Sequence, residues 1–229
     1  VYYAVKKISY DKNNNVVKER VNTNAPGGAE RYNEIEYTYD NRNRLITTKS
    51  YDGEKNNYIQ NYYDLKGNLL RVYTGLSSPV TINGPDDVNT GNDSEYAVTK
   101  YSYDALGRVT ETTDALGKSE TNTYDNSTGL VVSSTDRNGN CFVYGYDGLN
   151  NLKTKSLADG TNAETHTYDL SGKIITLQNG TTTINYTYNN KGLPAAETDM
   201  SSGTVKSYTY DSNGNRTSFV LSRNAQTEI

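Results

Sequence analysis

The sequence predicts an all-β fold of repeated antiparallel β-hairpins, and three observations lead to this prediction. A Tyr-Asp pair recurs, alternating apolar and polar residues precede it, and a Gly or Asn follows three residues after the Asp. The repeat tyrosines are Tyr10, Tyr39, Tyr63, Tyr103, Tyr124, Tyr146, Tyr168, Tyr188 and Tyr210. From Tyr103 onward they lie 20 to 22 residues apart. A period of this length indicates a repeat protein, in which each unit buries its apolar surface against its neighbours.

Each repeat is expected to contain two strands and two tight turns. In residues 181–188, Ile184, Tyr186 and Tyr188 alternate with polar residues, which is the pattern of a half-exposed strand. A turn at 189–192 follows, residues 193–200 return as the partner strand, and a strand from 205 to 210 begins the next copy. Nine copies then give about eighteen strands, and a sheet of that width is expected to curve.

The turn chemistry explains why the copies look alike. In the segment 103–109, Asp104 is expected to open a type I turn and to accept a hydrogen bond from the backbone two residues later. Gly107 occupies the slot that adopts a left-handed backbone. Asn43 and Asn150 fill that slot in two copies, and Asn tolerates this conformation better than most residues. Apolar residues two positions later are expected to anchor the second strand: Leu45, Leu69, Val109, Leu152 and Ile174, with Arg216 as an exception.

The N-terminal third is less regular, since steps of 29, 24 and 40 residues separate its repeat tyrosines. The largest excess predicts a loop insertion at 74–96, which contains two prolines and four acidic residues. No shift in composition divides the chain, so we expect one repeat array over residues 1–229.

Composition excludes several classes of protein. Few aliphatic residues are present, but 22 tyrosines and a net charge of −4 argue against disorder. Basic and acidic residues are interspersed, so we expect no nucleic-acid partner. No apolar run is long enough for a transmembrane segment, and the start of the sequence has no signal-peptide pattern.

The pattern Tyr-x-Tyr-Asp-x-x-Gly-Arg-Val at 101–109 closely resembles the tyrosine-aspartate (YD) repeats of the Rhs family. That family includes bacterial polymorphic toxins, insecticidal toxin complex components, wall-associated proteins and teneurins. The resemblance covers residues 10–217 and implies a curved, spiralling sheet that forms part of a shell around a toxin. It also implies that the repeat residues are structural. The Asp-Pro segment of complete shells does not occur here, so we expect a piece of wall without its plug or cargo.

No catalytic, cofactor-binding or metal-binding residue is expected. His166 stands in a slot held elsewhere by tyrosine, and Cys141 opens a strand-like run, so both are interpreted as structural. The segments 136–140 and 211–215 resemble calcium loops, but neither has the closing Glu that such a loop requires. The expected structural repeat residues are Tyr10, Asp11, Tyr39, Asp40, Tyr63, Asp64, Gly67, Tyr103, Asp104, Gly107, Tyr124, Asp125, Tyr146, Asp147, Tyr168, Asp169, Gly172, Tyr188, Gly192, Tyr210, Asp211 and Gly214.

The resulting hypothesis is a non-enzymatic segment of an Rhs-type secreted or cell-surface protein, which encloses a C-terminal toxin or other cargo. Its expected partners are adjoining repeats and the enclosed polypeptide, and the isolated piece is expected to self-associate through exposed sheet edges. The alternative is an adhesion or carbohydrate-binding module, in which exposed tyrosines bind glycans. A shell needs its tyrosines packed between repeats, whereas a glycan platform needs them exposed to solvent.

Overall fold

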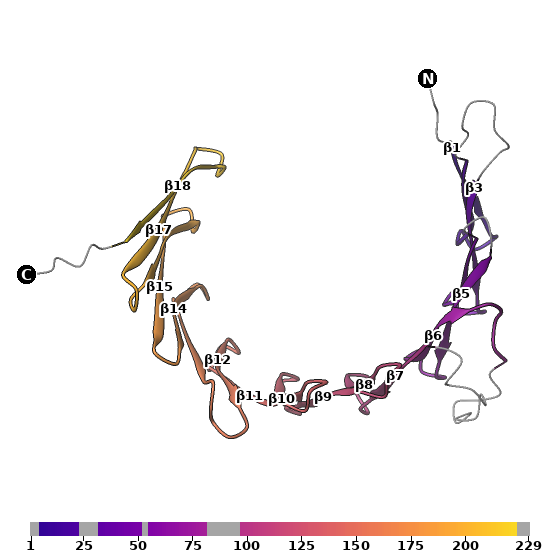
Figure 1. The fold of residues 1–229 in the computed structure, drawn as a ribbon, viewed down its shortest axis with the longest axis horizontal. Helices are drawn as coiled ribbons and strands as arrows, with labels where there is room; N and C mark the ends of the chain where they lie inside the picture. The colour runs from indigo at the N-terminus through magenta and orange to yellow at the C-terminus, as the bar shows by residue number, and fades with distance from the viewer. Residues whose placement is uncertain (1–4, 23–31, 52–54, 82–96, 224–229) are drawn as a thin grey trace, which may run out of the picture. The chain divides into compact units, whose positions relative to one another are not determined.

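A computed structural model describes residues 5–22, 32–51, 55–81 and 97–223, and these residues form eighteen β-strands and no helix (Figure 1). Every strand pairing with a defined register is antiparallel, so the predicted all-β repeat fold is confirmed. Within the described ranges, no helix is long and apolar enough to cross a membrane.

Contacts divide the chain into two compact units, unit 1 (Val1–Thr121) and unit 2 (Asn122–Ile229), and the boundary falls inside β9. In each unit the strands pair in chain order as a meander. The first nine strands are β1 Val5–Tyr10, β2 Val16–Asn22, β3 Tyr32–Tyr39, β4 Leu45–Tyr51, β5 Asn56–Tyr63, β6 Leu69–Leu76, β7 Ala97–Tyr103, β8 Val109–Thr113 and β9 Ser119–Tyr124. The others are β10 Val131–Thr135, β11 Cys141–Tyr146, β12 Leu152–Leu157, β13 Glu164–Tyr168, β14 Ile174–Asn179, β15 Thr182–Tyr188, β16 Pro194–Asp199, β17 Thr204–Tyr210 and β18 Arg216–Arg223.

Most hairpins share one irregularity beside the repeat tyrosine. In β15–β16, Thr187 pairs with Ala196 but Tyr188 pairs with Pro194, so Ala195 is an extra residue in the second strand. This is a β-bulge, which increases the local twist of the strand. The same shift occurs at the end of β1, β3, β5, β7, β11, β13 and β17. Arg216 pairs with Tyr210, just as the apolar anchor residues of other copies pair with the repeat tyrosines of those copies. The last copy therefore keeps the repeat register.

The register defines two faces of each unit, because paired residues share a face and successive residues alternate. We call the face that carries the repeat tyrosines the tyrosine face. In unit 2 the other face is uncharged at its paired positions from β12 to β18, and we call it the hydroxyl face. Its members include Thr154, Thr165, Thr167, Thr176, Gln178, Thr183, Asn185, Thr198, Ser207 and Thr209.

Complete burial of apolar side chains is confined to one place in the described residues. Tyr73, Leu76 and Val98 are 0%, 1% and 4% exposed, and they lie on β6 and β7 opposite the tyrosine face of unit 1. Elsewhere apolar side chains are half-buried or exposed. Local stability in those hairpins therefore rests on ladder hydrogen bonds and cross-strand contacts within the sheet.

The first three residues of the predicted insertion at 74–96 belong to a strand. β6 continues to Leu76, since Thr74 still pairs with Ala97 of β7, so residues 74–76 belong to the strand. Residues 82–96 lie outside the described part of the chain. The prediction of one array over 1–229 stays a prediction.

Candidate functional site: the tyrosine latches and the turn rim

The hairpin turns repeat one hydrogen-bond pattern, which the β7–β8 turn illustrates. Asp104 N–H donates to the carbonyl of Arg108 at 3.0 Å, and Gly107 N–H donates to the Asp104 carbonyl at 3.1 Å. The Asp104 carboxylate accepts from the N–H groups of Leu106 (2.9 Å) and Arg108 (3.0 Å). The predicted bond to the backbone two residues later is therefore confirmed. The carboxylate stabilises the turn because it accepts hydrogen bonds from backbone N–H groups that the strand ladder leaves unpaired.

These bonds also set the charge state of the turn carboxylates. The Arg44 N–H holds the pKa of Asp40 below its usual range, and the Arg108 N–H does the same for Asp104. At Asp211 the largest cause of the lowered pKa is the side-chain amide of Asn215. A carboxylate that accepts several hydrogen bonds is favoured in its charged form, so these groups stay ionised well into acid.

Left-handed backbone occurs at the predicted turn position. Gly107 has φ +81°, and Asn43 and Asn150 have φ +61° and +66° in the equivalent slot. A Cβ at Gly107 would meet the Asn68 side chain at an ordinary 3.6 Å. Glycine is therefore required there by its backbone conformation and not by lack of space.

A repeat tyrosine ends the first strand of each hairpin, and in several hairpins its hydroxyl is bonded to the preceding hairpin. We call each such bond a tyrosine latch. The donors, acceptor carbonyls and distances are Tyr39 to Val16 (2.9 Å), Tyr63 to Leu45 (3.1 Å), Tyr103 to Leu69 (2.8 Å), Tyr146 to Val131 (2.7 Å), Tyr168 to Leu152 (2.6 Å) and Tyr188 to Ile174 (2.8 Å).

The latch replaces a missing ladder bond. Between hairpins, the β14–β15 ladder begins at Thr176 paired with Asn185, so it does not reach Ile174 at the start of β14. The Ile174 carbonyl accepts the Tyr188 hydroxyl instead. An unpaired backbone carbonyl that is removed from water is costly, so this bond stabilises the contact between successive repeats. Burial raises the pKa of Tyr188, as it does that of Tyr103, Tyr146 and Tyr168, which keeps these hydroxyls protonated as donors.

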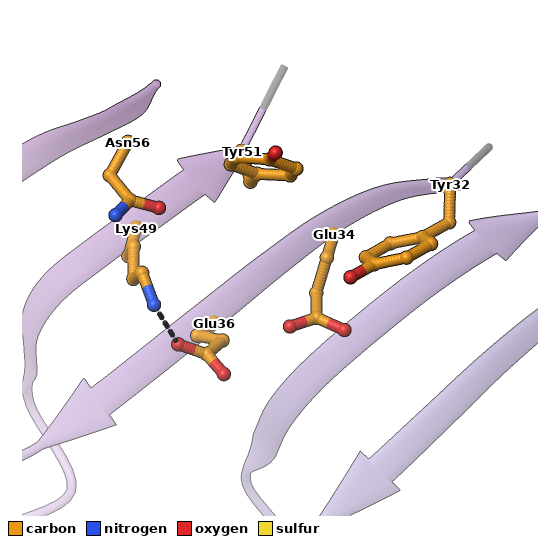
Figure 2. A pocket seen from close by; sticks show the side chains of 6 residues that line it. All are labelled: Tyr32, Glu34, Glu36, Lys49, Tyr51 and Asn56. Carbon is orange, nitrogen blue, oxygen red and sulfur yellow. Dashed lines mark hydrogen bonds and ion pairs between the residues drawn. The ribbon is translucent and has the colours of Figure 1, made fainter. Parts of the chain in front are cut away.

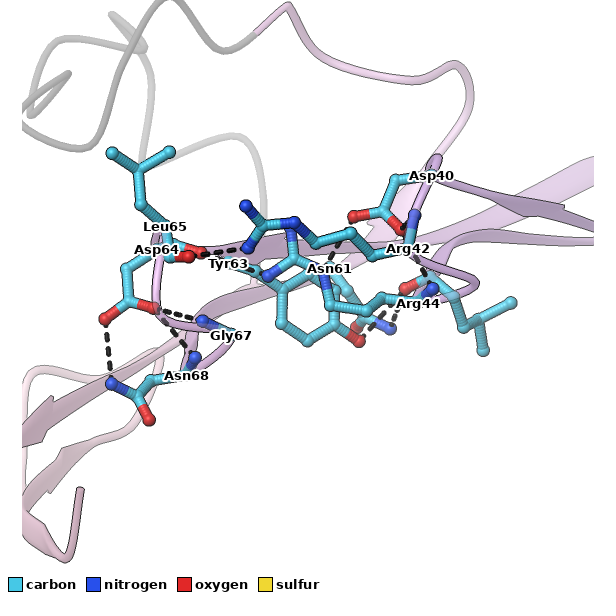
Figure 3. A network of polar contacts seen from close by, with 10 residues as sticks. Asp40, Arg42, Arg44, Asn61, Tyr63, Asp64, Leu65, Gly67 and Asn68 are labelled. Atoms are coloured by element: carbon cyan, nitrogen blue, oxygen red, sulfur yellow. Dashed lines mark hydrogen bonds and ion pairs between the residues drawn. The ribbon is translucent and has the colours of Figure 1, made fainter.

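Charged side chains tie neighbouring turns together along one edge of unit 1, which we call the turn rim (Figure 3). Arg44 donates from Nε to Asp40 in its own turn (2.6 Å) and from Nη1 to the carbonyl of Asp64 in the next turn (3.0 Å). Its guanidinium also lies 4.7 Å from the centroid of the Tyr63 ring. Arg42 donates to the carbonyl of Leu65 at 2.6 Å. Arg44 thus bonds to its own turn and to the next turn, and it contacts the ring of Tyr63, which makes the next latch.

Two latch carbonyls accept a second side chain. Asn61 and Tyr63 both donate to the Leu45 carbonyl, at 3.0 and 3.1 Å. His166 and Tyr168 share the Leu152 carbonyl, and the His166 Nδ1 contact is 3.2 Å. His166 therefore donates through Nδ1 and is 9% exposed in a slot that tyrosine holds elsewhere. Cys141 is half-buried at the start of β11 and pairs with Thr135.

A shallow pocket lies in unit 1, on the face opposite the repeat tyrosines (Figure 2). Tyr32 and Tyr51 lie at its rim with their ring centroids 6.4 Å apart, and Glu34 lies between them. Arg20 covers one face of the Tyr32 ring at 3.7 Å. Lys18 holds Glu34 at 2.8 Å, and Lys49 and Asn56 complete the lining together with Glu36.

The structure places the repeat tyrosines at strand ends and their Asp or Asn partners in the turns. Sequence reasoning missed three features of this arrangement. Asp114 and Asp136 form the same turn on the other edge without a preceding tyrosine, and the shared Asp-Ala-Leu-Gly at 104 and 114 was the available signal. The acceptors of the latches and the buried cluster on β6 and β7 had no local signal, because both depend on strand register. Among the described residues, no group of three or more His, Cys, Asp or Glu side chains is placed to hold a metal ion.

Comparison with known proteins connects this geometry to a family. The RHS Repeat family model matches residues 93–119 and 124–163. The tRNA3(Ser)-specific nuclease WapA of Bacillus spizizenii is 29% identical over 215 residues, which cover 91% of this chain and 8% of that protein.

Two solved structures share the fold at low sequence identity. A crystal structure of TcdB2-TccC3-TEV gives a TM-score of 0.53 at 14% identity, covering 91% of this chain and 14% of that one. A crystal structure of TcdB2-TccC3-Cdc42 gives a TM-score of 0.53 at 14% identity, and the match covers 92% of this chain and 14% of that one. This chain thus spans a small part of the nuclease and of these two structures. Tyrosine-aspartate turns at a regular period, the RHS Repeat match and the shared fold together support the similarity of this chain to the Rhs, or YD, repeat family.

Proposed function

We propose that this chain is a non-enzymatic wall segment of an Rhs-type shell that encloses a toxin or another polypeptide. The tyrosine latch is the observation that carries this proposal. Each latch joins a hairpin to the one before it through a side chain that the repeat itself supplies, so the wall grows by adding hairpins and needs no separate core. The matched relative is named as a nuclease of which this chain covers 8%, which favours a structural role for the segment.

The partners of such a segment are adjoining repeats and the enclosed polypeptide. β1 and β18 begin and end the run of strands, and most of their side chains are exposed. Exposed strands accept further strands, so we expect adjoining repeats at these edges and self-association of the isolated piece. Sedimentation velocity at increasing concentration tests this, and a monomer at every concentration contradicts it. A secreted or cell-surface location belongs to the same proposal.

Protease protection tests containment. In the parent protein, the enclosed polypeptide is expected to resist a protease concentration that digests the same polypeptide expressed alone. In the parent protein, Gly107→Val is the test variant, because it strains one turn of the wall and should open it there. Gly148→Val is the matched control, and it should leave the wall intact because Gly148 has no left-handed backbone. Equal digestion of free and parent-linked polypeptide contradicts containment. Cleavage of tRNA by the purified 229-residue chain contradicts the non-enzymatic role.

The pocket between Tyr32 and Tyr51 favours a second candidate function, which is glycan binding. Two phenol rings, the Glu34 carboxylate and the Asn56 amide are groups that stack on a sugar ring and accept or donate hydrogen bonds to its hydroxyls. Saturation-transfer NMR with a panel of disaccharides tests it. We expect signal transfer that disappears with Tyr51→Ala and persists with Tyr144→Ala in unit 2, and no transfer from any sugar contradicts this candidate.

A further inference from the structure

The joint between the first two hairpins of the chain has two kinds of contact. Asn13 and Asn15 of the first turn donate from their side-chain amides to the Oδ1 atom of Asn43, at 2.9 and 3.0 Å. Tyr39 donates its hydroxyl to the Val16 carbonyl at 2.9 Å. Asn43 is the left-handed residue of the second turn. Two amides and one latch therefore hold the second hairpin against the first.

The last described turn, 211–215, carries the same pair of amide donors as the first turn. The Asp211 carboxylate accepts from the N–H groups of Asn213 and Asn215, both at 2.9 Å, and from the Asn215 side-chain amide at 3.0 Å. In the first turn, the Asp11 carboxylate accepts the same three bonds at 2.8, 2.8 and 3.0 Å. Both asparagines of the last turn are exposed. Because the two turns share this geometry, the last turn presents its two amides as the first turn does.

The β1 end of the chain carries the partners for these amides and for a latch. Asn14 is exposed and has φ +66°, in the slot that Asn43 fills in the second turn at φ +61°. Tyr10 ends β1 and is 55% exposed, whereas the tyrosines that form latches are half-buried. Arg216 begins β18 as Val16 begins β2, so its carbonyl occupies the place of a latch acceptor. Each end of the described strands therefore has one half of the joint.

The two edge strands also fit each other in the register of the first joint. In that joint, Lys18 of β2 pairs with Glu36 of β3. With the same register, β18 meets β1 of a second copy without placing like charges opposite each other. The opposed pairs are Ser218 and Lys7, Phe219 and Lys6, and Val220 and Val5. Phe219, Val220 and Val5 are 51%, 54% and 49% exposed, so this pairing removes apolar surface from water.

We infer that the β18 end of this chain binds the β1 end of a second copy. Asn213 and Asn215 donate to Asn14 of that copy, and its Tyr10 donates to the Arg216 carbonyl. This inference rests on the proposed function and adds the polarity of the contact. The occupant follows from continuity with the joint between the first two hairpins, which uses the same donors and the same kind of acceptor. Because the two surfaces differ, the contact is head-to-tail, and such contacts continue into rings or open filaments.

Sedimentation velocity of the 229-residue chain tests this polarity with two complementary variants. Asn14→Gly removes the acceptor at the β1 end, and glycine keeps the left-handed backbone. Asn213→Ser combined with Asn215→Lys removes the amides at the β18 end and introduces the residue types that the turn 169–173 already has. Each variant should raise the dissociation constant by about tenfold. At a concentration where neither variant associates alone, their mixture should form a one-to-one complex, because each supplies the half that the other lacks.

The matched control is Asn150→Gly, because Asn150 has φ +66° in a turn between β11 and β12 and should leave association unchanged. Tyr10→Phe removes only a hydroxyl and should weaken association by about fivefold. Three results overturn the inference: a wild type that is monomeric at every concentration, equal weakening by Asn150→Gly, and a mixture that associates no more than its components.

Circular dichroism shows whether each variant keeps the wild-type strand content. If the Asn213 and Asn215 variant does not fold, Tyr10→Phe decides, and an unchanged dissociation constant then overturns the inference. Sedimentation reports on contacts between copies, whereas the protease assay reports on the polypeptide enclosed by the parent protein. A failed joint therefore does not contradict containment, and failed containment does not contradict the joint.

Discussion

The hairpins of unit 2 and the β5–β7 region of unit 1 have the same turns and latches, but only β5–β7 buries apolar side chains completely. In unit 2, the latches of Tyr146, Tyr168 and Tyr188 act between half-buried strands. In unit 1, the regular repeat is interrupted after β6, and the buried cluster of Tyr73, Leu76 and Val98 lies there. The comparison teaches that regular repeats are held mainly by local and nearest-neighbour bonds, whereas an interruption is accompanied by a small core.

The faces opposite the repeat tyrosines differ in the same way. In unit 1, Lys18, Glu36 and Lys49 pair across β2, β3 and β4 at 3.0 and 2.9 Å. In unit 2, the hydroxyl face has neutral side chains at the equivalent paired positions, such as Thr167, Thr176 and Asn185. The tyrosine face is constant because the latch requires it, and the opposite face is free to vary between repeats.

The largest expected effect comes from truncating a side chain of the buried cluster on β6 and β7. Tyr73→Ala should destabilise unit 1 by about 3–5 kcal/mol, because it leaves a cavity in the buried cluster. Urea unfolding followed by hydrogen exchange in each unit measures it. Tyr186→Ala in half-buried β15 is the matched control and should cost clearly less. Equal losses of stability at the two sites would mean that the buried cluster is no more of a core than the rest of the sheet.

The next prediction tests whether glycine is required at position 107 for its backbone conformation or for its small size. Gly107→Val should cost about 2 kcal/mol, because a β-branched residue is strained at φ +81° although its Cβ has room. Gly148→Val in the β11–β12 turn provides the control, since Gly148 has an ordinary φ and open space around it. Thermal melting of both variants measures the difference. Matching melting temperatures would refute the left-handed assignment.

A smaller effect compares single and shared latches. Tyr103→Phe removes the hydroxyl bonded to the Leu69 carbonyl and should cost about 1 kcal/mol. Tyr168→Phe should cost less, because His166 still contacts the Leu152 carbonyl. Urea midpoints of the two variants, and of Tyr168→Phe combined with His166→Phe, measure this. Additive losses in the double variant would contradict a shared acceptor.

The smallest effect per site is the acid dependence of the turns. Turn carboxylates such as Asp211 have a pKa below the ordinary 3.8, so their contribution is present above that value and is lost as the pH falls through the lower folded pKa. Stability should therefore decline below about pH 4. Asp211→Asn should weaken this decline, since Asn189 already accepts the same bonds from Lys191 and Leu193 in its turn. Circular dichroism from about pH 7 to pH 2 measures it, and an identical decline in the variant would contradict the assignment.

Local features were predictable from the sequence because they depend on residues close together in the chain. The strand at 182–188, the turn at Asp104 and the left-handed Asn43 follow from alternation and turn chemistry over a few residues. The buried cluster on β6 and β7 was not predictable, because Gln60, Tyr73 and Val98 meet only after a bulge and two strand pairings set the register. The latch acceptors were missed for the same reason.

The sequence by itself determined the architecture, since each repeat encodes its own two strands and its own reversal through alternation, a turn carboxylate and a left-handed glycine or asparagine. The tertiary structure alone decided which carbonyl each tyrosine hydroxyl meets and where side chains become fully buried. Both depend on the register between strands and on where a ladder stops, and these are properties of neighbouring strands together, which no single repeat contains.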